Sequence, residues 1–236
     1  MGSNIKGQKY NYLISILIWG SYWGIFEATV GYFLHSISFP YSFLVWYPVA
    51  CFFMYNVYRK THQLSSVFAV GVLCAFIKLL NLFLPGRIDK VINPAVAIVF
   101  EALAMFITIA LAQKFWVKEE KNVFRKAVIA FSMNTLWRVF YIIYLAFFVP
   151  EWIREISVII SAEKFIPFFI TQNFLTSMIV FIGYQYKTVV LKLFLITERK
   201  FAAKSAAVPP KRLVALQVAF TIILLGVNIS LQLLLK

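Results

Sequence analysis

The chain has 236 residues, of which 62% are hydrophobic and 14% charged, and its formal net charge is +14. A soluble domain could not bury this much apolar surface, and the apolar residues come in blocks long enough to cross a hydrocarbon core about 30 Å thick. The basic residues lie in short segments between these blocks, a distribution typical of membrane insertion rather than nucleic-acid binding. The sequence therefore predicts a membrane protein whose main partner is the lipid bilayer, with no nucleic-acid partner.

Seven apolar blocks are candidate membrane-spanning helices. The second block is short and Pro48 interrupts it, which predicts a kinked, tilted or partly re-entrant helix. The expected fold is all-α: a polytopic transmembrane helical bundle with a six-helix body and a C-terminal seventh helix. The blocks span residues 12–36, 43–58, 65–84, 93–115, 126–149, 164–186 and 213–235.

The distribution of charge predicts four parts and an orientation. A cytoplasmic tail at 1–11 precedes a six-helix domain at 12–186, and a basic cytoplasmic linker at 187–212 leads to a C-terminal transmembrane helix at 213–236. Sixteen Lys and Arg residues fall in segments on one predicted side of the membrane and four on the other. Because cytoplasmic loops are enriched in these residues, we expect a multi-pass protein of the cell (inner) membrane with a cytoplasmic N-terminus.

Four charged residues lie inside the predicted spans, two acidic and two basic. A charge at mid-bilayer costs at least about 2.5–3.5 kcal/mol on insertion scales unless it is paired or hydrated. The four could neutralise one another as structural ion pairs, or they could meet a polar ligand. Amide side chains at similar depth favour a ligand site, because a structural cluster needs no spare hydrogen-bonding groups. The predicted ligand-binding residues are Glu27, Lys78, Glu101, Asn134, Arg138 and Asn173.

Small residues recur every four positions on the first predicted helix, at Gly20, Gly24 and Ala28. This spacing lets another helix approach closely. Packing against a helix of the same chain is one interpretation, and docking onto a partner protein is the other.

Signatures of known catalytic chemistry are absent from the sequence. It has no HExxH zinc motif, no GxSxG elbow and no Walker loop, and its one Asp, Asp89, excludes a paired-aspartate protease. Its two cysteines, Cys51 and Cys74, fall inside apolar blocks and indicate neither a disulfide framework nor a metal site. We therefore expect no catalytic residue, no metal and no cofactor.

Six helices with a cytoplasmic N-terminus, the small-residue stripe and a polar layer toward the outer face resemble the substrate-binding S components of energy-coupling-factor transporters. The resemblance covers about residues 10–190. It implies a small polar ligand held near the outer face, and partners in a coupling membrane protein and ATPase subunits. It also implies that Gly20, Gly24 and Ala28 dock onto the coupling protein, whereas the seventh helix departs from the family plan.

Two other functions remain open at this point. One is a membrane-embedded enzyme or assembly factor acting on a lipid-linked substrate, with Lys78 and Arg138 binding phosphate. The other is a structural subunit whose buried charges only orient it within a larger membrane complex. The favoured hypothesis is binding and transport of a small polar molecule.

Overall fold

The structure is a computed structural model that describes residues 2–36, 41–83, 87–115 and 122–186, with short pieces between 215 and 230. All regular secondary structure in these ranges is helical, which confirms the all-α prediction. The whole of the predicted linker at 187–212 and most of the seventh helix lie outside the described residues. The pieces of the seventh helix that are described are helical, and the six-plus-one helix count stays a prediction.

The observed helices follow the first six apolar blocks closely. α1 begins at Gly2, so the helix includes most of the predicted tail, where no proline interrupts it. The third block ends in a 3-10 turn, η1, and the sixth contains a π-helical turn, η2. The elements are α1 (Gly2–Ser36), α2 (Phe43–Thr61), α3 (Ser65–Leu79), η1 (Leu80–Phe83), α4 (Asp89–Phe115), α5 (Val123–Phe147), α6 (Glu151–Arg154), α7 (Ala162–Ile166), η2 (Pro167–Thr171) and α8 (Gln172–Gln185).

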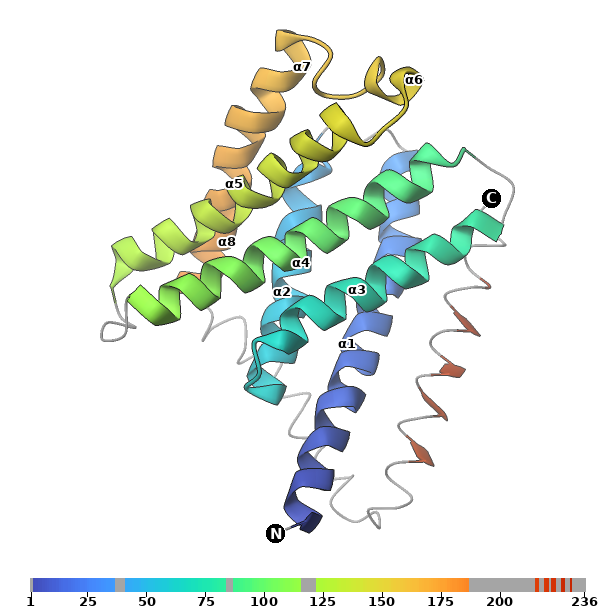
Figure 1. The fold of residues 1–236 in the computed structure, drawn as a ribbon, viewed down its shortest axis with the longest axis vertical. Helices are drawn as coiled ribbons and strands as arrows, with labels where there is room; N and C mark the ends of the chain where they lie inside the picture. Colours follow the sequence, from blue (N-terminus) through green and yellow to red (C-terminus); the bar gives the residue numbers. More distant parts are fainter. Residues whose placement is uncertain are drawn as a thin grey trace.

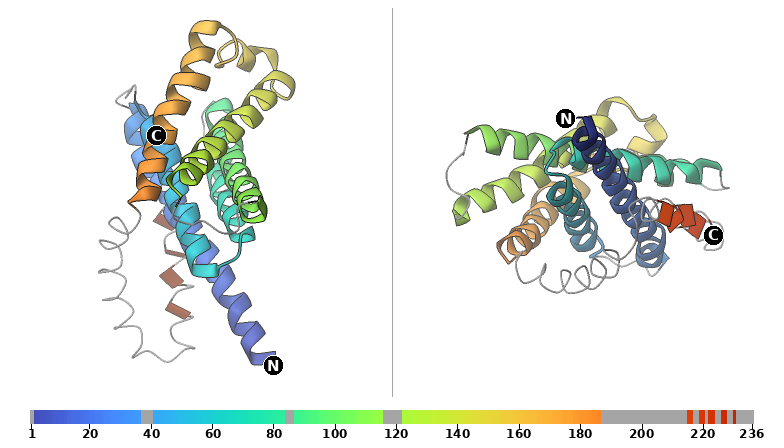
Figure 2. Two further views of the ribbon diagram at one scale, coloured as in Figure 1. Left: turned by 90° about the vertical axis from the view of Figure 1, so that its left-hand side faces the viewer. Right: turned by 90° about the horizontal axis from the view of Figure 1, so that it is seen from below.

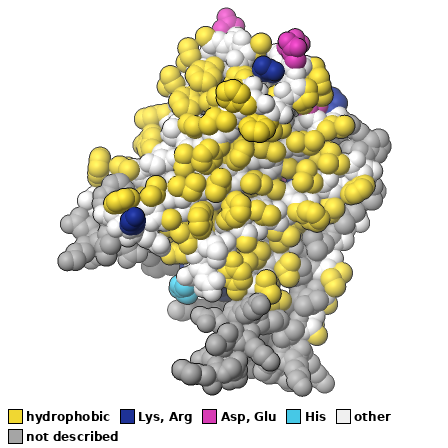
Figure 3. Space-filling model, in the orientation of Figure 1, with side chains coloured by type: hydrophobic (Ala, Val, Ile, Leu, Met, Phe, Trp, Pro, Cys, Tyr) yellow, Lys and Arg dark blue, Asp and Glu magenta, His cyan; other side chains and the backbone are white. Residues whose placement is uncertain are grey.

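Four helical stretches among the described residues are long and apolar enough to cross a membrane. They are Ser65–Phe83, Asp89–Phe115, Val123–Phe147 and Ala162–Gln185. Large apolar side chains cover the face seen in Figure 3, and acidic side chains appear at the end where α6 and α7 lie. A face this apolar is compatible with lipid and not with water.

The six long helical segments form two layers of three. α3, α4 and α5 lie side by side in the layer nearest the viewer in Figure 1, with α4 in the middle. α1, α2 and α8 form the layer behind, with α2 in the middle, and Figure 2 shows both layers from the side and from below. α2 and α4 therefore occupy the centre of the bundle, and α5 packs against α8 at one edge.

α2 lies at the centre of the bundle and buries polar as well as apolar side chains. Its buried residues include Tyr47, Met54, Asn56 and Val57. A helix surrounded by other helices needs a smaller lipid-facing surface, so polar side chains are tolerated on it. Pro48 lies inside the helix and cannot donate to the carbonyl one turn earlier, which loosens the helix at that point.

Candidate functional site

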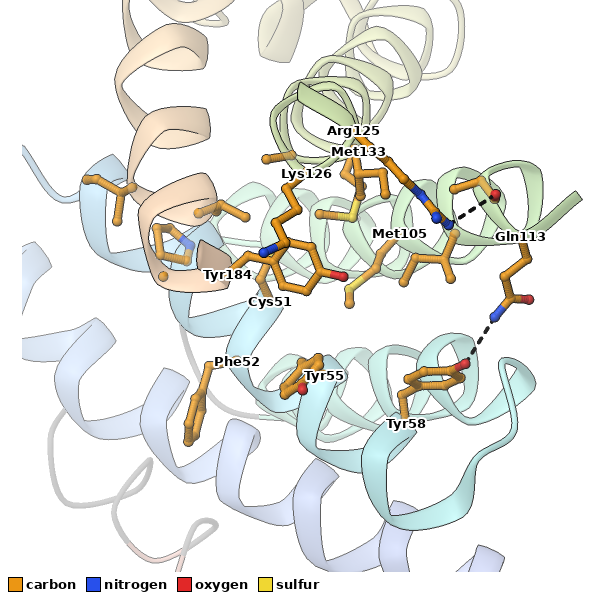
Figure 4. A pocket seen from close by; sticks show the side chains of 18 residues that line it. Cys51, Phe52, Tyr55, Tyr58, Met105, Gln113, Arg125, Lys126, Met133 and Tyr184 are labelled. Carbon is orange, nitrogen blue, oxygen red and sulfur yellow. Dashed lines mark hydrogen bonds between the residues drawn. The ribbon is translucent and has the colours of Figure 1, made fainter. Parts of the chain in front are cut away.

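A cavity of about 460 Å³ lies between α2, α4, α5 and α8 (Figure 4). This volume falls in the range of about 300–1,000 Å³ that is typical of small-molecule sites. α2, α4 and α8 run toward one end of the cavity and finish there, whereas α5 begins there. We call this end the basic end, because Arg125 and Lys126 line the cavity there.

The opposite, deep part of the cavity is apolar. Pro48 and Cys51 of α2 contribute to its wall, at the place where the proline loosens that helix. Met105 and Met133 also line it, and because methionine is the most adaptable of apolar side chains, the wall can adjust to ligands of different shape. The other apolar lining residues are Ile109, Ile129, Ile179 and Val180.

Two cations mark the basic end of the cavity, both from the first turns of α5. Asn122 caps this helix by accepting hydrogen bonds from the backbone N–H groups of Phe124 and Arg125, which fixes where the helix starts. Lys126 Nζ donates to Gln185 Oε1 of α8 at 2.9 Å and lies 5.8 Å from the ring centroid of Tyr184. The two residues therefore project from a fixed helix start into the cavity (Figure 4).

Arg125 reaches in the other direction, toward α4. Its Nη2 donates to the carbonyl oxygen of Ala112 at 3.4 Å, a long hydrogen bond. On the far wall Gln113 Nε2 donates to Tyr58 Oη at 3.0 Å, which ties α4 to α2 (Figure 4). The basic end is thus a ring of polar groups from all four helices around an apolar interior.

The sequence-predicted ligand residues lie elsewhere, and none of the six lines this cavity. Glu101 is one turn farther from the basic end than Met105, and Arg138 is more than a turn beyond Met133. Glu101 interacts electrostatically with both Glu27 and Arg138, and Glu27 interacts with Lys78. The four predicted charges therefore lie near enough to interact, and we call them the charged layer; Glu101 and Arg138 of this set lie beyond the deep end of the cavity.

Among the described residues, the charges of this layer form no ion pair within 4 Å. The ion pair present in this part of the chain joins Arg87 to Asp89, at 2.8 Å, outside the layer. Arg138 is 2% exposed and its Nη1 donates to the carbonyl oxygen of Phe168, in the π turn, at 2.6 Å. The guanidinium also lies over the rings of Trp137 and Phe168, at 4.8 and 4.6 Å from their centroids. Arg138 thus joins α5 to the π turn through the backbone carbonyl and the ring of Phe168, while Trp137 packs on it from the same helix.

Asn134 and Asn173 form a buried hydrogen-bond network between α5 and α8. Asn134 Nδ2 donates to the Asn173 carbonyl and to Ser177 Oγ, both at 2.9 Å, and Trp137 Nε1 donates to Asn134 Oδ1 at 2.7 Å. Asn173 Nδ2 donates to Thr135 Oγ1 at 2.9 Å. The side-chain amides of Asn134 and Asn173 thus link α5 to α8 by hydrogen bonds. Their contact with a ligand stays a prediction.

The small-residue stripe of α1 meets a helix of the same chain at one position. A Cβ added at Gly20 would lie 2.6 Å from Leu73 Cδ2 of α3, so only glycine fits this close approach without a shift. Gly24 is also buried, and the side chain of Ala28 lies outside the described residues. The contact at Gly20 supports intramolecular packing for that residue, and docking onto a partner remains untested.

Sequence reasoning missed the cavity cations because it read Arg125 as a loop residue and Lys126 as the first residue of a span, and counted both with the basic residues of the cytoplasmic side. The signal available was Asn122, a good N-cap residue directly before the apolar run. Placing the helix start there would have put both cations on the first turns of a helix. Their convergence with Gln113 and Tyr184 could not have been read from one sequence, because it depends on which helix ends meet.

Comparisons with known proteins leave the family open. No protein-family model, no curated protein and no solved structure matches this chain. The resemblance to S components of energy-coupling-factor transporters therefore stays a prediction, and the function has to be argued from the geometry alone.

Proposed function

We propose that this chain is a multi-pass membrane protein that binds a small molecule in the cavity between α2, α4, α5 and α8 and takes part in its transport. The observation that carries the proposal is the cavity itself, which has a ligand-sized volume of about 460 Å³ inside the bundle. Its lining combines an apolar interior with convergent polar groups at one end, the usual composition of a small-molecule site.

The orientation supports access from the cytoplasm. Arg125 and Lys126 lie at the same end of the bundle as Arg59, Lys60 and Lys114. The positive-inside rule places such an end at the cytoplasmic surface of the cell membrane. The cavity then begins at that surface and leads toward the charged layer of Glu101 and Arg138, which is a suitable arrangement for a path across the bundle.

The sequence-based expectation of a small polar ligand belongs to the charged layer rather than to the cavity. The apolar cavity wall instead supports a ligand with a substantial apolar part. The S-component resemblance implies coupling to a membrane partner and ATPase subunits. This coupling is compatible with the proposal, and the ATPase subunits would supply the energy for transport.

A second candidate is an enzyme or assembly factor acting on a lipid-linked substrate. The observation that favours it is the same lining, since a lipid-linked group needs an apolar wall beside polar contacts at membrane-surface depth. Turnover that depends on Glu27 or Glu101 would distinguish the enzyme from the transporter.

Filling the cavity tests the proposal. Gly183 of α8 lines the cavity, and an added Cβ there meets nothing within 4 Å, so Gly183→Phe should occupy the space without a clash in the helix. Gly226 is equally open and does not line the cavity, which makes Gly226→Phe the matched control.

The measurement is mass spectrometry of small molecules that co-purify with each protein from nanodiscs. We expect the unmodified chain and Gly226→Phe to retain a bound molecule and Gly183→Phe to lose it. Retention by a monodisperse Gly183→Phe protein, or no bound molecule in any of the three, would contradict binding in this cavity.

A further inference from the structure

We propose that the cavity ligand is an amphiphile with one anionic head, a carboxylate or a phosphate monoester, whose apolar chain lies between α2, α4, α5 and α8. The head would lie between Arg125 and Lys126 at the basic end. This inference rests on the proposed function and sharpens it by naming the class of ligand.

Among the described residues, the two cations are held by neutral groups only. Lys126 Nζ donates to the amide oxygen of Gln185, and Arg125 Nη2 donates to the backbone carbonyl of Ala112 at the long distance of 3.4 Å. Among the described residues no carboxylate lies within 4 Å of either cation. An ammonium has three donors and a guanidinium five, so both groups keep donors for an anion.

The positions of the cations suit one shared anion. They are consecutive residues on α5 that both line the basic end of the cavity, Arg125 on the side of α4 and Lys126 on the side of α8, so a head group between those helices would have a cation on each side. An anion between them would also lie near the N-terminus of α5, where the helix dipole favours negative charge. Tyr58 Oη accepts a hydrogen bond from Gln113 and can still donate its own proton toward the same space.

The rest of the cavity suits an apolar chain and would penalise a compact polar solute. Beyond the basic end the wall is made by side chains such as Met105, Ile109, Met133 and Val180. A polar solute would leave its groups without hydrogen-bond partners there, whereas a hydrocarbon chain gains by leaving water. The charge at one end and the apolar wall at the other together specify an anionic amphiphile.

The buried Arg138 is a weaker candidate for the anion. Its guanidinium is enclosed by the rings of Trp137 and Phe168 and donates to the Phe168 carbonyl, so an anion would have to displace these contacts. It also lies outside the cavity lining.

Photo-crosslinking with three matched probes tests the inference. Each probe carries a diazirine on a sixteen-carbon chain, and the heads are a carboxylate, a phosphate monoester and an uncharged alcohol. The full chain is embedded in nanodiscs of zwitterionic phosphatidylcholine, and labelled peptides are mapped to α4, α5 and α8. We expect each anionic probe to label the cavity wall at least about tenfold more than the alcohol, as is usual for a charged hydrogen bond.

A pair of substitutions that removes both positive charges provides the decisive variant. Arg125→Gln with Lys126→Gln should reduce labelling by both anionic probes to the level of the alcohol. The control pair, Lys60→Gln with Lys114→Gln, removes the same charge at the same end of the bundle outside the cavity lining and should leave labelling unchanged. All variants must elute as one species and share the thermal transition of the unmodified chain.

The outcomes separate this inference from the function on which it rests. Equal labelling by acid and alcohol, or full labelling of the Arg125 and Lys126 variant, would overturn the anionic head while leaving a cavity that binds apolar molecules. Labelling that also persists in Gly183→Phe would overturn cavity binding itself. A preference for phosphate over carboxylate, or the reverse, supports the proposal and identifies the head group.

Discussion

The helices α5 and α8 meet at one edge of the bundle and also line the cavity a few turns away. Their polar side chains have different hydrogen-bond partners in these two regions. At the edge, Asn134, Asn173 and Arg138 donate to groups of the facing helix or its π turn, and all three are at most 9% exposed. In the cavity, the acceptors that half-buried Arg125 and Lys126 contact among the described residues are neutral. The amides of Asn134 and Asn173 are hydrogen-bonded within the protein and stabilise the fold, whereas half-buried cations that keep spare donors are available to a ligand. Arg138 also keeps an Nε without a hydrogen-bond partner among the described residues, but it is only 2% exposed.

The largest expected effect is on Arg138. Arg138→Met would leave the Phe168 carbonyl without its donor and remove both ring contacts, so we expect a loss of about 1.5–3 kcal/mol in unfolding free energy. Titration with a denaturing detergent measures this loss. Unchanged stability together with lost ligand binding would instead make Arg138 a ligand residue, as the sequence analysis predicted.

Glu101 sharpens the same test. If Arg138 only offsets the buried charge of Glu101, then Glu101→Gln combined with Arg138→Met should recover part of the lost stability. No recovery in the double variant would show that the backbone and ring contacts of Arg138 dominate.

Asn134 should have the next largest effect. Asn134→Ala removes two donated hydrogen bonds and the acceptor of Trp137 Nε1, and we expect a loss of about 1–2 kcal/mol, since interhelical hydrogen bonds in membranes are individually modest. Labelling of the cavity per folded molecule should not change. The matched control is Ser132→Ala, an exposed residue on the same helix. A comparable loss in the control would contradict a role specific to the network.

A smaller effect is expected where α1 meets α3. Gly20→Ala forces Leu73 to move, which should cost about 1 kcal/mol, whereas Gly183→Ala meets open space and should cost nothing. Thermal unfolding compares the two variants. If Gly20→Ala keeps full stability but loses co-purifying proteins, the stripe serves a partner rather than α3.

The smallest expected effect concerns salt. The cations at the basic end are half-buried, so raising the ionic strength from about 0.1 M to 1 M, which shortens the Debye length from about 10 to 3 Å, should weaken labelling by the anionic probes by a few-fold. Labelling by the alcohol should stay constant. A salt response equal for all three probes would indicate a change in the membrane rather than screening at Arg125 and Lys126.

Much of the fold could be predicted because it depends on local pattern. The length of each apolar block predicted where a helix runs, and the first six blocks match α1 to α5 and the segment from α7 to α8. Pro48 lies inside α2, and the kinked, tilted or re-entrant course predicted for that helix stays a prediction. The common depth of the four buried charges was predicted from their positions along the helices and also stays a prediction.

By itself, then, the sequence determined the helical class and the approximate course of the first six helical segments, which follow from the chain's periodicity and apolar length. The tertiary structure alone decided that Gly20 faces Leu73, that Arg138 bonds to a backbone carbonyl and that α2, α4, α5 and α8 leave a cavity with Arg125 and Lys126 at one end. Each of these depends on which faces of distant helices pack together. That choice is set by side-chain packing across the bundle and is not encoded in any single segment.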